Sequence, residues 1–216
     1  MKTQYILFDL DNTLYNAETI FAEIRTLIKV WLSEALSITP DEAYTLSLHY
    51  YHTYGSTLNG IRREHPNLDS DAYLAHIHKV PVETYLQPNP VLAAMLARLP
   101  LPKVIFTNSV CEWSERVLGR LEVREHFERI IDIRAVHYQG KPNPLAFQHV
   151  LDILEVPGNA CIFVDDHPLN IQAGLDAGMQ AILVSDNGAS VDAGAAPVVK
   201  DVLAAEPILL KMLDVA

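Results

Sequence analysis

The chain has 216 residues, half of them apolar, and a formal net charge of −11. That length suits one α/β domain, or a core domain carrying a smaller insertion, and the apolar half can bury a substantial core. The negative charge excludes a nucleic-acid polymer and an anionic membrane as main partners, because both select a basic protein face. A small phosphorylated ligand needs only a local positive site.

Targeting signals and cysteine usage indicate a soluble cytoplasmic protein. Residues 1–4 lead directly into an apolar strand pattern, which argues against a signal peptide, and no apolar run approaches membrane-spanning length. Cys111 and Cys161 lie far apart and lack the spacing of metal ligands, so we expect reduced thiols in or near the core. No sequence feature fixes the oligomeric state.

The first predicted strand, Tyr5 to Phe8, ends in two acidic residues spaced two apart. Because side chains alternate along an extended backbone, Asp9 and Asp11 can emerge on the same side of the strand end. Two carboxylates held that close repel each other unless a cation or a proton separates them, which favours Mg²⁺ or a division of labour between nucleophile and acid/base. Asp-x-Asp is also ordinary turn chemistry, and Asn12 and Thr13 are turn or helix-cap residues.

The section from residue 15 to residue 87 has helical periodicity and no strand pattern. Thr39 and Pro40 suit the N-cap and first position of a second helix there, and Gly55 suits its end. We predict an all-helical cap seated over the sheet. Its first helix carries an apolar stripe at spacings of three and four, made of Phe21, Ile24, Leu27, Ile28, Trp31, Leu32 and Leu36.

The rest of the chain, 88–216, alternates short apolar strands with helical patterns. Such strands predict a parallel sheet covered by helices on both faces, completed by the strand in 1–14. A last helix is predicted over 201–213, after a loop around Asn187 and Gly188. The expected strands of this part are 104–106, 130–133, 161–164 and 181–184.

Two polar segments follow predicted strands of this core, where a parallel sheet holds its ligands. Thr107, Asn108 and Ser109 offer hydroxyls, an amide and backbone N–H groups that suit a phosphate cradle, or simply a helix cap. Lys141 lies just before Pro142 and Pro144, which stiffen the approach to the next helix and fix where Lys141 points. It either balances a carboxylate cluster and binds a phosphoryl oxygen, or is a solvated surface charge.

A third polar segment, Asp165 and Asp166, directly follows the apolar strand 161–164. Burying adjacent carboxylates without compensation is costly, so either they lie in an exposed loop or they hold a cation. Mg²⁺ fits, because it takes one or two carboxylates, keeps several waters and binds the substrate phosphate.

The four motifs together resemble those of haloacid dehalogenase-like phosphatases that carry a helical cap between the first and second motifs. The resemblance covers nearly the whole chain and implies an α/β fold, a Rossmann-like parallel sheet flanked by helices, with an inserted all-helical cap. The motifs here are Asp9-Leu10-Asp11-Asn12-Thr13, Thr107-Asn108, Lys141 and Asp165-Asp166.

This resemblance implies a role for each motif residue. Asp9 is similar in position to the nucleophile that becomes an aspartyl phosphate, and Asp11 to the general acid that later acts as base. Thr107 and Asn108 would hold phosphoryl oxygens, and Lys141 would neutralise charge on the phosphoryl group and on the nucleophile.

The same resemblance implies Mg²⁺ as cofactor. Its ligands would be Asp9, the backbone carbonyl of Asp11 and Asp166, with Asp165 acting directly or through water. The acid at the position of Asp11 also separates reaction types, because haloalkanoate dehalogenases of this architecture lack it. We therefore expect phosphoryl transfer. Sugar-phosphate mutases keep both acids, so mutase activity remains an alternative.

The predicted cap and the flanking motifs resemble the pyrimidine 5′-nucleotidase branch. Tyr51 and Tyr54 lie three apart on a helix and can share a face that stacks on a nucleobase, or they can pack within the cap. We predict hydrolysis of pyrimidine nucleoside 5′-monophosphates. The alternatives are a phosphatase for another small metabolite, such as phosphoglycolate or a sugar phosphate, and a noncatalytic module that binds a phosphorylated ligand.

Overall fold

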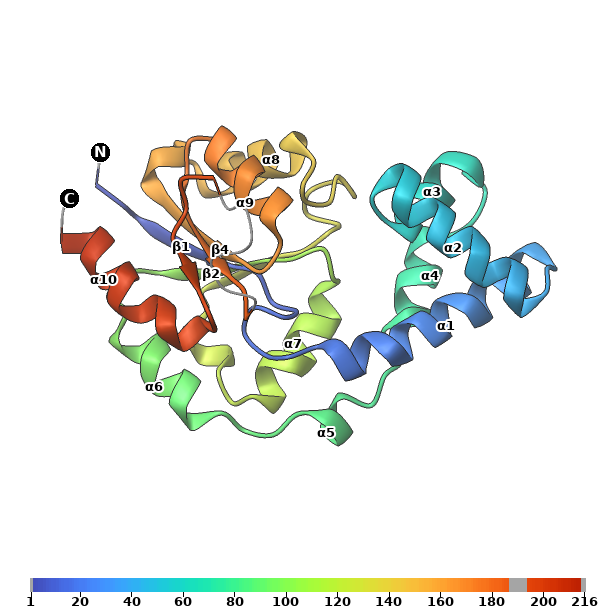
Figure 1. Cartoon of the computed structure of the whole chain (residues 1–216), viewed down its shortest axis with the longest axis horizontal. Helices are drawn as coiled ribbons and strands as arrows, with labels where there is room; N and C mark the ends of the chain where they lie inside the picture. Colours follow the sequence, from blue (N-terminus) through green and yellow to red (C-terminus); the bar gives the residue numbers. More distant parts are fainter. Residues whose placement is uncertain (1, 187–193, 215–216) are drawn as a thin grey trace. The chain divides into compact units, whose positions relative to one another are not determined.

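The computed structural model describes residues 2–186 and 194–214, which form two compact units (Figure 1). The core unit comprises Met1–Asn16 and Leu86–Ala216, and the helical unit comprises Ala17–Tyr85.

A six-stranded parallel sheet in the order β3-β2-β1-β4-β5-β6 forms the centre of the core unit. Its strand β1 is fully buried over Ile6, Leu7 and Phe8 and pairs with β2 on one side and β4 on the other. The predicted α/β class and parallel sheet are confirmed. The strands are β1 (Tyr5–Phe8), β2 (Lys103–Phe106), β3 (Arg129–Ile131), β4 (Cys161–Asp165), β5 (Gln180–Val184) and β6 (Val198–Val199).

Helices cover both faces of this sheet. Figure 1 shows α8 (Pro144–Leu154) and α9 (Pro168–Asp176) on one face, and α6 (Pro90–Arg98), α7 (Cys111–Arg120) and α10 (Glu206–Asp214) on the other. Proline occupies the first turn of α6, α8 and α9, where its missing N–H costs nothing. Short 3-10 helices, η1 (Arg124–His126) and η2 (Gly158–Ala160), precede β3 and β4.

Two predicted elements of the core unit differ from the structure, and one observed strand was not predicted. The strand expected over 130–133 is β3 and ends at Ile131, because the chain turns into the loop that carries Asp132. The helix expected over 201–213 is a 3-10 helix, η4 (Val202–Ala205), followed by α10. Strand β6 was not predicted, since two residues are too few to show a period. The predicted loop at Asn187 and Gly188 lies outside the described residues.

The helical unit contains five helices within the described residues. The predicted capping of α2 is confirmed: the Thr39 hydroxyl accepts from the Glu42 N–H, the Glu42 carboxylate accepts from the Thr39 N–H, and Gly55 ends the helix with a φ of 80°. The helices are α1 (Glu18–Leu36), α2 (Pro40–Tyr54), α3 (Thr57–Glu64), α4 (Ser70–Ile77) and α5 (Val82–Tyr85).

A close contact joins two of these helices. Tyr50 on α2 is fully buried, and Gly60 on α3 faces it so closely that a Cβ at Gly60 would lie 2.1 Å from Tyr50 Cγ. The Tyr50 hydroxyl bonds to His65 Nε2 at 2.8 Å. Glycine is therefore the residue that allows α3 to approach α2 here.

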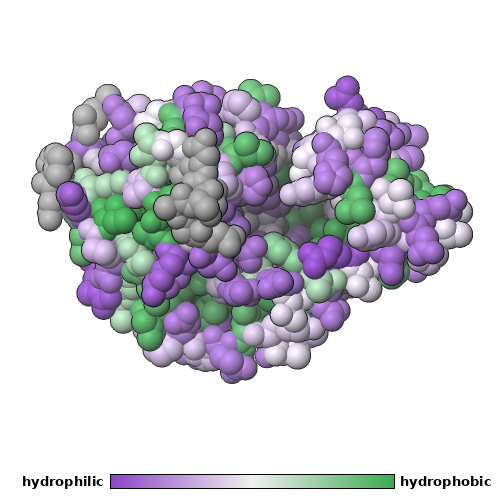
Figure 2. Space-filling model, viewed as in Figure 1, coloured by the Kyte–Doolittle hydropathy of each residue, from purple (hydrophilic) through white to green (hydrophobic). Residues whose placement is uncertain are grey.

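Apolar side chains on the surface of the core unit come from separate helices. The most exposed are Val91 on α6, Leu145 on α8 and Leu169 on α9. Figure 2 shows green areas interspersed with purple ones on the viewed face. Among the described residues, no helix has both the length and the apolarity needed to span a bilayer.

Candidate active site

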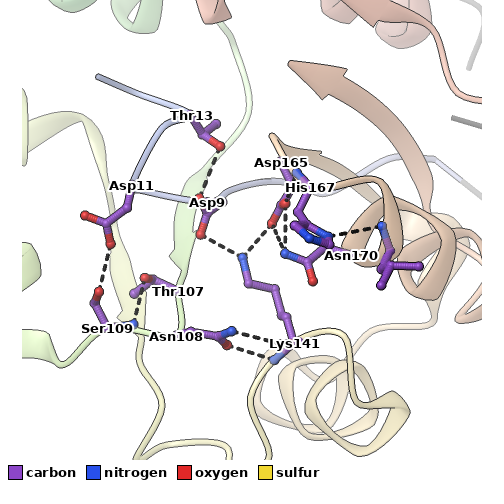
Figure 3. Close-up of polar contacts among 11 residues, drawn as sticks. Asp9, Asp11, Thr13, Thr107, Asn108, Ser109, Lys141, Asp165, His167 and Asn170 are labelled. Atoms are coloured by element: carbon purple, nitrogen blue, oxygen red, sulfur yellow. Dashed lines mark hydrogen bonds and ion pairs between the residues drawn. The ribbon is translucent and has the colours of Figure 1, made fainter. Parts of the chain in front are cut away.

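The carboxyl ends of the central strands bring the predicted motifs together (Figure 3). Asp9 follows β1, Thr107 follows β2, and Asp165 is the last residue of β4. Lys141 arrives from the loop between β3 and α8. The pairing of β1 with β2 and β4 places these ends next to one another, so the topology of the sheet builds the cluster.

Lys141 bridges two of the aspartates. Its Nζ donates to Asp9 Oδ1 at 2.8 Å and to Asp165 Oδ2 at 2.7 Å, and its side chain is only 1% exposed. The ammonium also lies 5.0 Å and 5.2 Å from the ring centroids of Phe106 and Phe163, which shield it from water. Lys141 is therefore a buried counter-ion of the cluster and not a surface charge.

Asp165 is completely buried and held on both oxygens. Its Oδ1 accepts from the His167 N–H at 2.8 Å and from Asn170 Nδ2 at 2.9 Å, while Oδ2 accepts from Lys141 and from Asn170 Nδ2 at 3.1 Å. These bonds satisfy a buried carboxylate and fix Lys141. Asn170 lies in the first turn of α9 and was not predicted as a site residue, although an amide five residues after Asp165 could have signalled it.

Lys141 supplies one positive charge, which does not balance the charges of all the carboxylates around it. Burial, with repulsion from Asp165 and Asp11, raises the pKa of Asp9 well above its ordinary value despite the opposing effect of Lys141. Burial and the charge of Asp165 likewise raise the pKa of Asp166 to about 6. For Lys141, burial lowers the pKa, but attraction to Asp165 and Asp9 outweighs burial and the pKa is raised.

The side-chain amide of Asn108 bonds to the backbone of Lys141. Its Nδ2 donates to the Lys141 carbonyl at 2.9 Å, and its Oδ1 accepts from the Lys141 N–H at 2.8 Å. A Cβ at Gly140 would lie 2.9 Å from Asn108 Oδ1, so glycine there leaves room for the amide. The side-chain amide of Asn108, which was predicted to hold phosphoryl oxygens, instead fixes the loop that carries Lys141. Phosphoryl binding by the backbone N–H of Asn108 stays a prediction.

Thr107 keeps a donor for a ligand. The side chain is buried, and its hydroxyl accepts from the Ser109 N–H at 3.0 Å while retaining its own hydrogen. Within residues 2–186 and 194–214, the Asn108 N–H has no acceptor. This turn after β2 therefore offers two donors next to Asp9.

Asp11 is held by three donors from outside the predicted motif set. Its Oδ1 accepts from the Tyr15 hydroxyl and from Trp113 Nε1, the latter at 3.1 Å, and its Oδ2 accepts from Ser109 Oγ at 2.7 Å. Burial and the charge of Asp11 raise the pKa of Tyr15, so the phenol stays protonated and donates. On the other aspartate, Asp9 Oδ2 accepts from Thr13 Oγ1 at 3.1 Å.

The two predicted nucleobase contacts lie in the helical unit. Tyr51 is 55% exposed, so it does not pack in the interior of that unit. The Tyr54 hydroxyl donates to Glu64 at 2.6 Å and its ring lies 5.6 Å from the Arg63 guanidinium carbon. The interior position on this helix belongs to Tyr50, and substrate contact by Tyr51 or Tyr54 stays a prediction.

A family model for haloacid dehalogenase-like hydrolases matches residues 3–178, which contain all of these motifs. The chain belongs to the haloacid dehalogenase-like hydrolase family. The match runs from β1 through α9 and includes the helical unit.

Two curated relatives of this hydrolase are named as phosphatases. The chain is 22% identical over 188 residues to 6-phosphogluconate phosphatase of Escherichia coli, covering 83% of this chain and 81% of that protein. It is 26% identical over 242 aligned positions to N-acylneuraminate-9-phosphatase of Mus musculus, covering 99% and 96%.

Solved structures of other family members share the fold. One is a 2-haloacid dehalogenase from Pseudomonas syringae, with a TM-score of 0.64, 22% identity and coverage of 97% of this chain and 99% of that one. Another is the hydrolase YfnB from Bacillus subtilis bound to magnesium, with a TM-score of 0.62, 15% identity and coverage of 99% and 100%. These neighbours show the fold.

The donor set of the site fits a divalent cation. Four aspartates gather here, and within the described part of the chain Lys141 is the only cationic side chain bonded to them. Burial, together with repulsion among the carboxylates, raises the pKa values of Asp9 and Asp166, and a bound cation would favour their ionised forms. The described residues contain no group of three or more His, Cys, Asp or Glu side chains at metal-binding distance, so waters and substrate oxygens would complete the coordination.

Proposed function

We propose that this hydrolase is a Mg²⁺-dependent phosphomonoester hydrolase that works through an aspartyl phosphate on Asp9. The observation that carries the proposal is the buried Asp9–Lys141–Asp165 chain beside a second acid, Asp11, and the free donors after β2. A dehalogenase needs no acid at the position of Asp11, whereas phosphoryl transfer needs one to protonate the leaving oxygen.

In the first step, a carboxylate oxygen of Asp9 attacks phosphorus and the bond from phosphorus to the leaving oxygen breaks. Asp11 gives its proton to that oxygen, and the alcohol leaves. Lys141 stays bonded to Asp9 and balances charge that passes from the carboxylate to the phosphoryl group. The Thr107 hydroxyl and the Asn108 N–H bind the phosphoryl oxygens.

In the second step, Asp11 takes a proton from water as the water attacks phosphorus. The bond to Asp9 breaks, and inorganic phosphate and the free carboxylate result. Asp9, Asp166 and the backbone carbonyl of Asp11 would hold Mg²⁺, which supplies Lewis-acid stabilisation of the phosphoryl charge. Because four bonds from three donors engage Asp165, its proposed part is to position Lys141, and any metal contact would run through water.

For the leaving group, we propose pyrimidine nucleoside 5′-monophosphates first, on the motif resemblance and on the exposed ring of Tyr51. The second candidate is a sugar phosphate, which the names of the two phosphatase relatives favour.

The deciding experiment measures phosphate release from UMP, CMP, AMP, 6-phosphogluconate, phosphoglycolate and p-nitrophenyl phosphate, with Mg²⁺ and with EDTA. Turnover that requires Mg²⁺ is expected. A preference for UMP and CMP supports the nucleotide proposal, and a preference for 6-phosphogluconate replaces it with the sugar phosphate. Binding of these esters without release of phosphate contradicts the enzymatic proposal and favours the noncatalytic module.

A further inference from the structure

Three side chains that the motifs do not include converge on the carboxylate of Asp11. Tyr15 comes from the end of the loop after β1, Ser109 from the turn after β2, and Trp113 from the first turn of α7. All three belong to the core unit, and both aromatic side chains are nearly buried. Their arrangement bears directly on how Asp11 can exchange a proton.

The loop after β1 brings Tyr15 back beside Asp11. Asn12 has a φ of 63°, the Leu14 N–H donates to the Leu10 carbonyl at 3.0 Å, and Asp11 and Tyr15 form an isolated backbone bridge. The phenol therefore reaches Asp11 across a single tight turn. Trp113 reaches the same oxygen from a helix 102 positions later in the chain, so two independent segments fix one atom.

The two oxygens of Asp11 are not equivalent. Oδ1 accepts two hydrogen bonds, and one of the donors is an indole N–H, which can never accept a proton. A proton bound to Oδ1 would point at the indole N–H, which is itself a donor and cannot accept it. Oδ2 accepts one bond, from Ser109, whose hydroxyl can rotate and either donate or accept.

We propose that Tyr15 and Trp113 are positioning residues that anchor Asp11 by Oδ1, so that Oδ2 is the oxygen that gives a proton to the leaving group and later takes one from water. This inference rests on the proposed function, because it assigns atoms to the acid/base step of that reaction. The exchanged proton then lies on Oδ2, the oxygen that also bonds to Ser109.

The test removes each donor while keeping an aromatic side chain, with Tyr15→Phe and Trp113→Phe. Tyr50→Phe and Trp31→Phe are the matched controls, because they delete a buried phenol bonded to His65 and an indole packed on Tyr73 in the helical unit. Each protein is assayed on p-nitrophenyl phosphate, whose leaving group needs little protonation, and on the faster of UMP and 6-phosphogluconate, whose alkoxide leaving group needs a proton.

For Tyr15→Phe and Trp113→Phe, we expect kcat/KM on the alkyl ester to fall about tenfold and kcat/KM on the aryl ester to change by less than about twofold. Both control variants should keep the wild-type ratio of the two values. An equal fall on both esters, or no fall on the alkyl ester, overturns the positioning role while leaving the hydrolase proposal intact. Absence of turnover by the wild-type protein on every ester overturns the proposed function instead.

A second measurement does not depend on turnover. The chain contains two tryptophans, so ¹⁵N-indole labelling gives two N–H signals, and Trp31→Phe assigns them. Asp11→Ala should move the Trp113 signal and leave that of Trp31 in place, while Asp152→Ala on the exposed side of α8 should move neither. An unmoved Trp113 signal in Asp11→Ala contradicts the anchoring of Oδ1.

Discussion

The core unit and the helical unit differ in how far along the chain many of their polar side chains reach for a partner. In the core unit, the bonds that matter span long stretches of chain: 132 positions from Lys141 to Asp9 and 98 from Ser109 to Asp11. In the helical unit, Thr39 bonds a residue 3 positions away, and Tyr54 one that is 10 positions away. The core thus builds a site from distant segments, whereas the polar contacts of the helical unit mostly stabilise its own helices.

This difference explains why the sequence indicates the chemistry of the site more clearly than its substrate specificity. Charged residues at adjacent strand ends must be compensated when they are buried, and this constraint ties their identities to a function. A tyrosine of the helical unit finds its hydrogen-bond partner within that unit, as Tyr54 does in Glu64, so its identity reveals little about a ligand.

The largest effect should come from Asp9→Asn, which removes the proposed nucleophile from the core unit. Turnover should fall by at least about a thousandfold with the fold kept, because an amide cannot form the aspartyl phosphate. Phosphate release and circular dichroism measure the two quantities, and Asp176→Asn is the control. Substantial residual activity in the purified variant would contradict the covalent mechanism.

Lys141→Met tests whether the core unit depends on its buried ammonium. The variant leaves Asp9 and Asp165 buried without their counter-ion, so the free energy of unfolding should fall by about 3–5 kcal/mol. Urea unfolding without Mg²⁺ measures the change. Lys200→Met removes an exposed lysine 3.8 Å from Asp201 and should cost less than about 1 kcal/mol; equal losses would refute the burial argument.

Mg²⁺ should stabilise the core unit through the carboxylates assigned to it. At a hundredfold excess over its dissociation constant, the ion should raise the free energy of unfolding by about 2.7 kcal/mol, and EDTA should reverse the gain. Thermal unfolding with and without Mg²⁺ measures the effect. Asp166→Asn should remove most of it, and a full increment in that variant would exclude Asp166 as a ligand.

Gly60→Ala should produce the smallest loss, in the helical unit. Its Cβ would overlap the ring of Tyr50, which should lower the free energy of unfolding by about 1–3 kcal/mol. The increment from Mg²⁺ should persist, because every proposed ligand lies in the core unit. Gly119→Ala on α7, where a Cβ meets nothing within 4 Å, should not destabilise the protein. A loss of the Mg²⁺ increment in Gly60→Ala would contradict the independence of the two units.

The sequence was sufficient for the parts of the fold that carry a period or a cap. Strand β1, the Thr39 cap and the Gly55 end of α2 were predicted because each depends on neighbouring residues. Asp9, Lys141 and Asp165 were predicted to gather because they follow strands of one parallel sheet, and the structure brings them within hydrogen-bond distance.

The contacts of the site that could not be predicted all depend on long-range docking. Trp113 lies in an amphipathic helix, where a tryptophan predicts only burial, and nothing local indicates that its indole meets Asp11. The amide of Asn108 has the right chemistry for a phosphate, yet its actual partner is a backbone 33 positions away. Such pairings follow from the packing of loops on the finished sheet.

Strand β1 lies between β2 and β4, and this order has a consequence for synthesis on the ribosome. All polypeptide that forms the helical unit has been made by residue 85, whereas the second neighbour of β1 begins at Cys161. At the usual pace of translation, roughly 8 to 30 seconds separate β1 from that partner. The helical unit can therefore form early, while the strand that leads into Asp9 stays unpaired on one edge until most of the chain has been made.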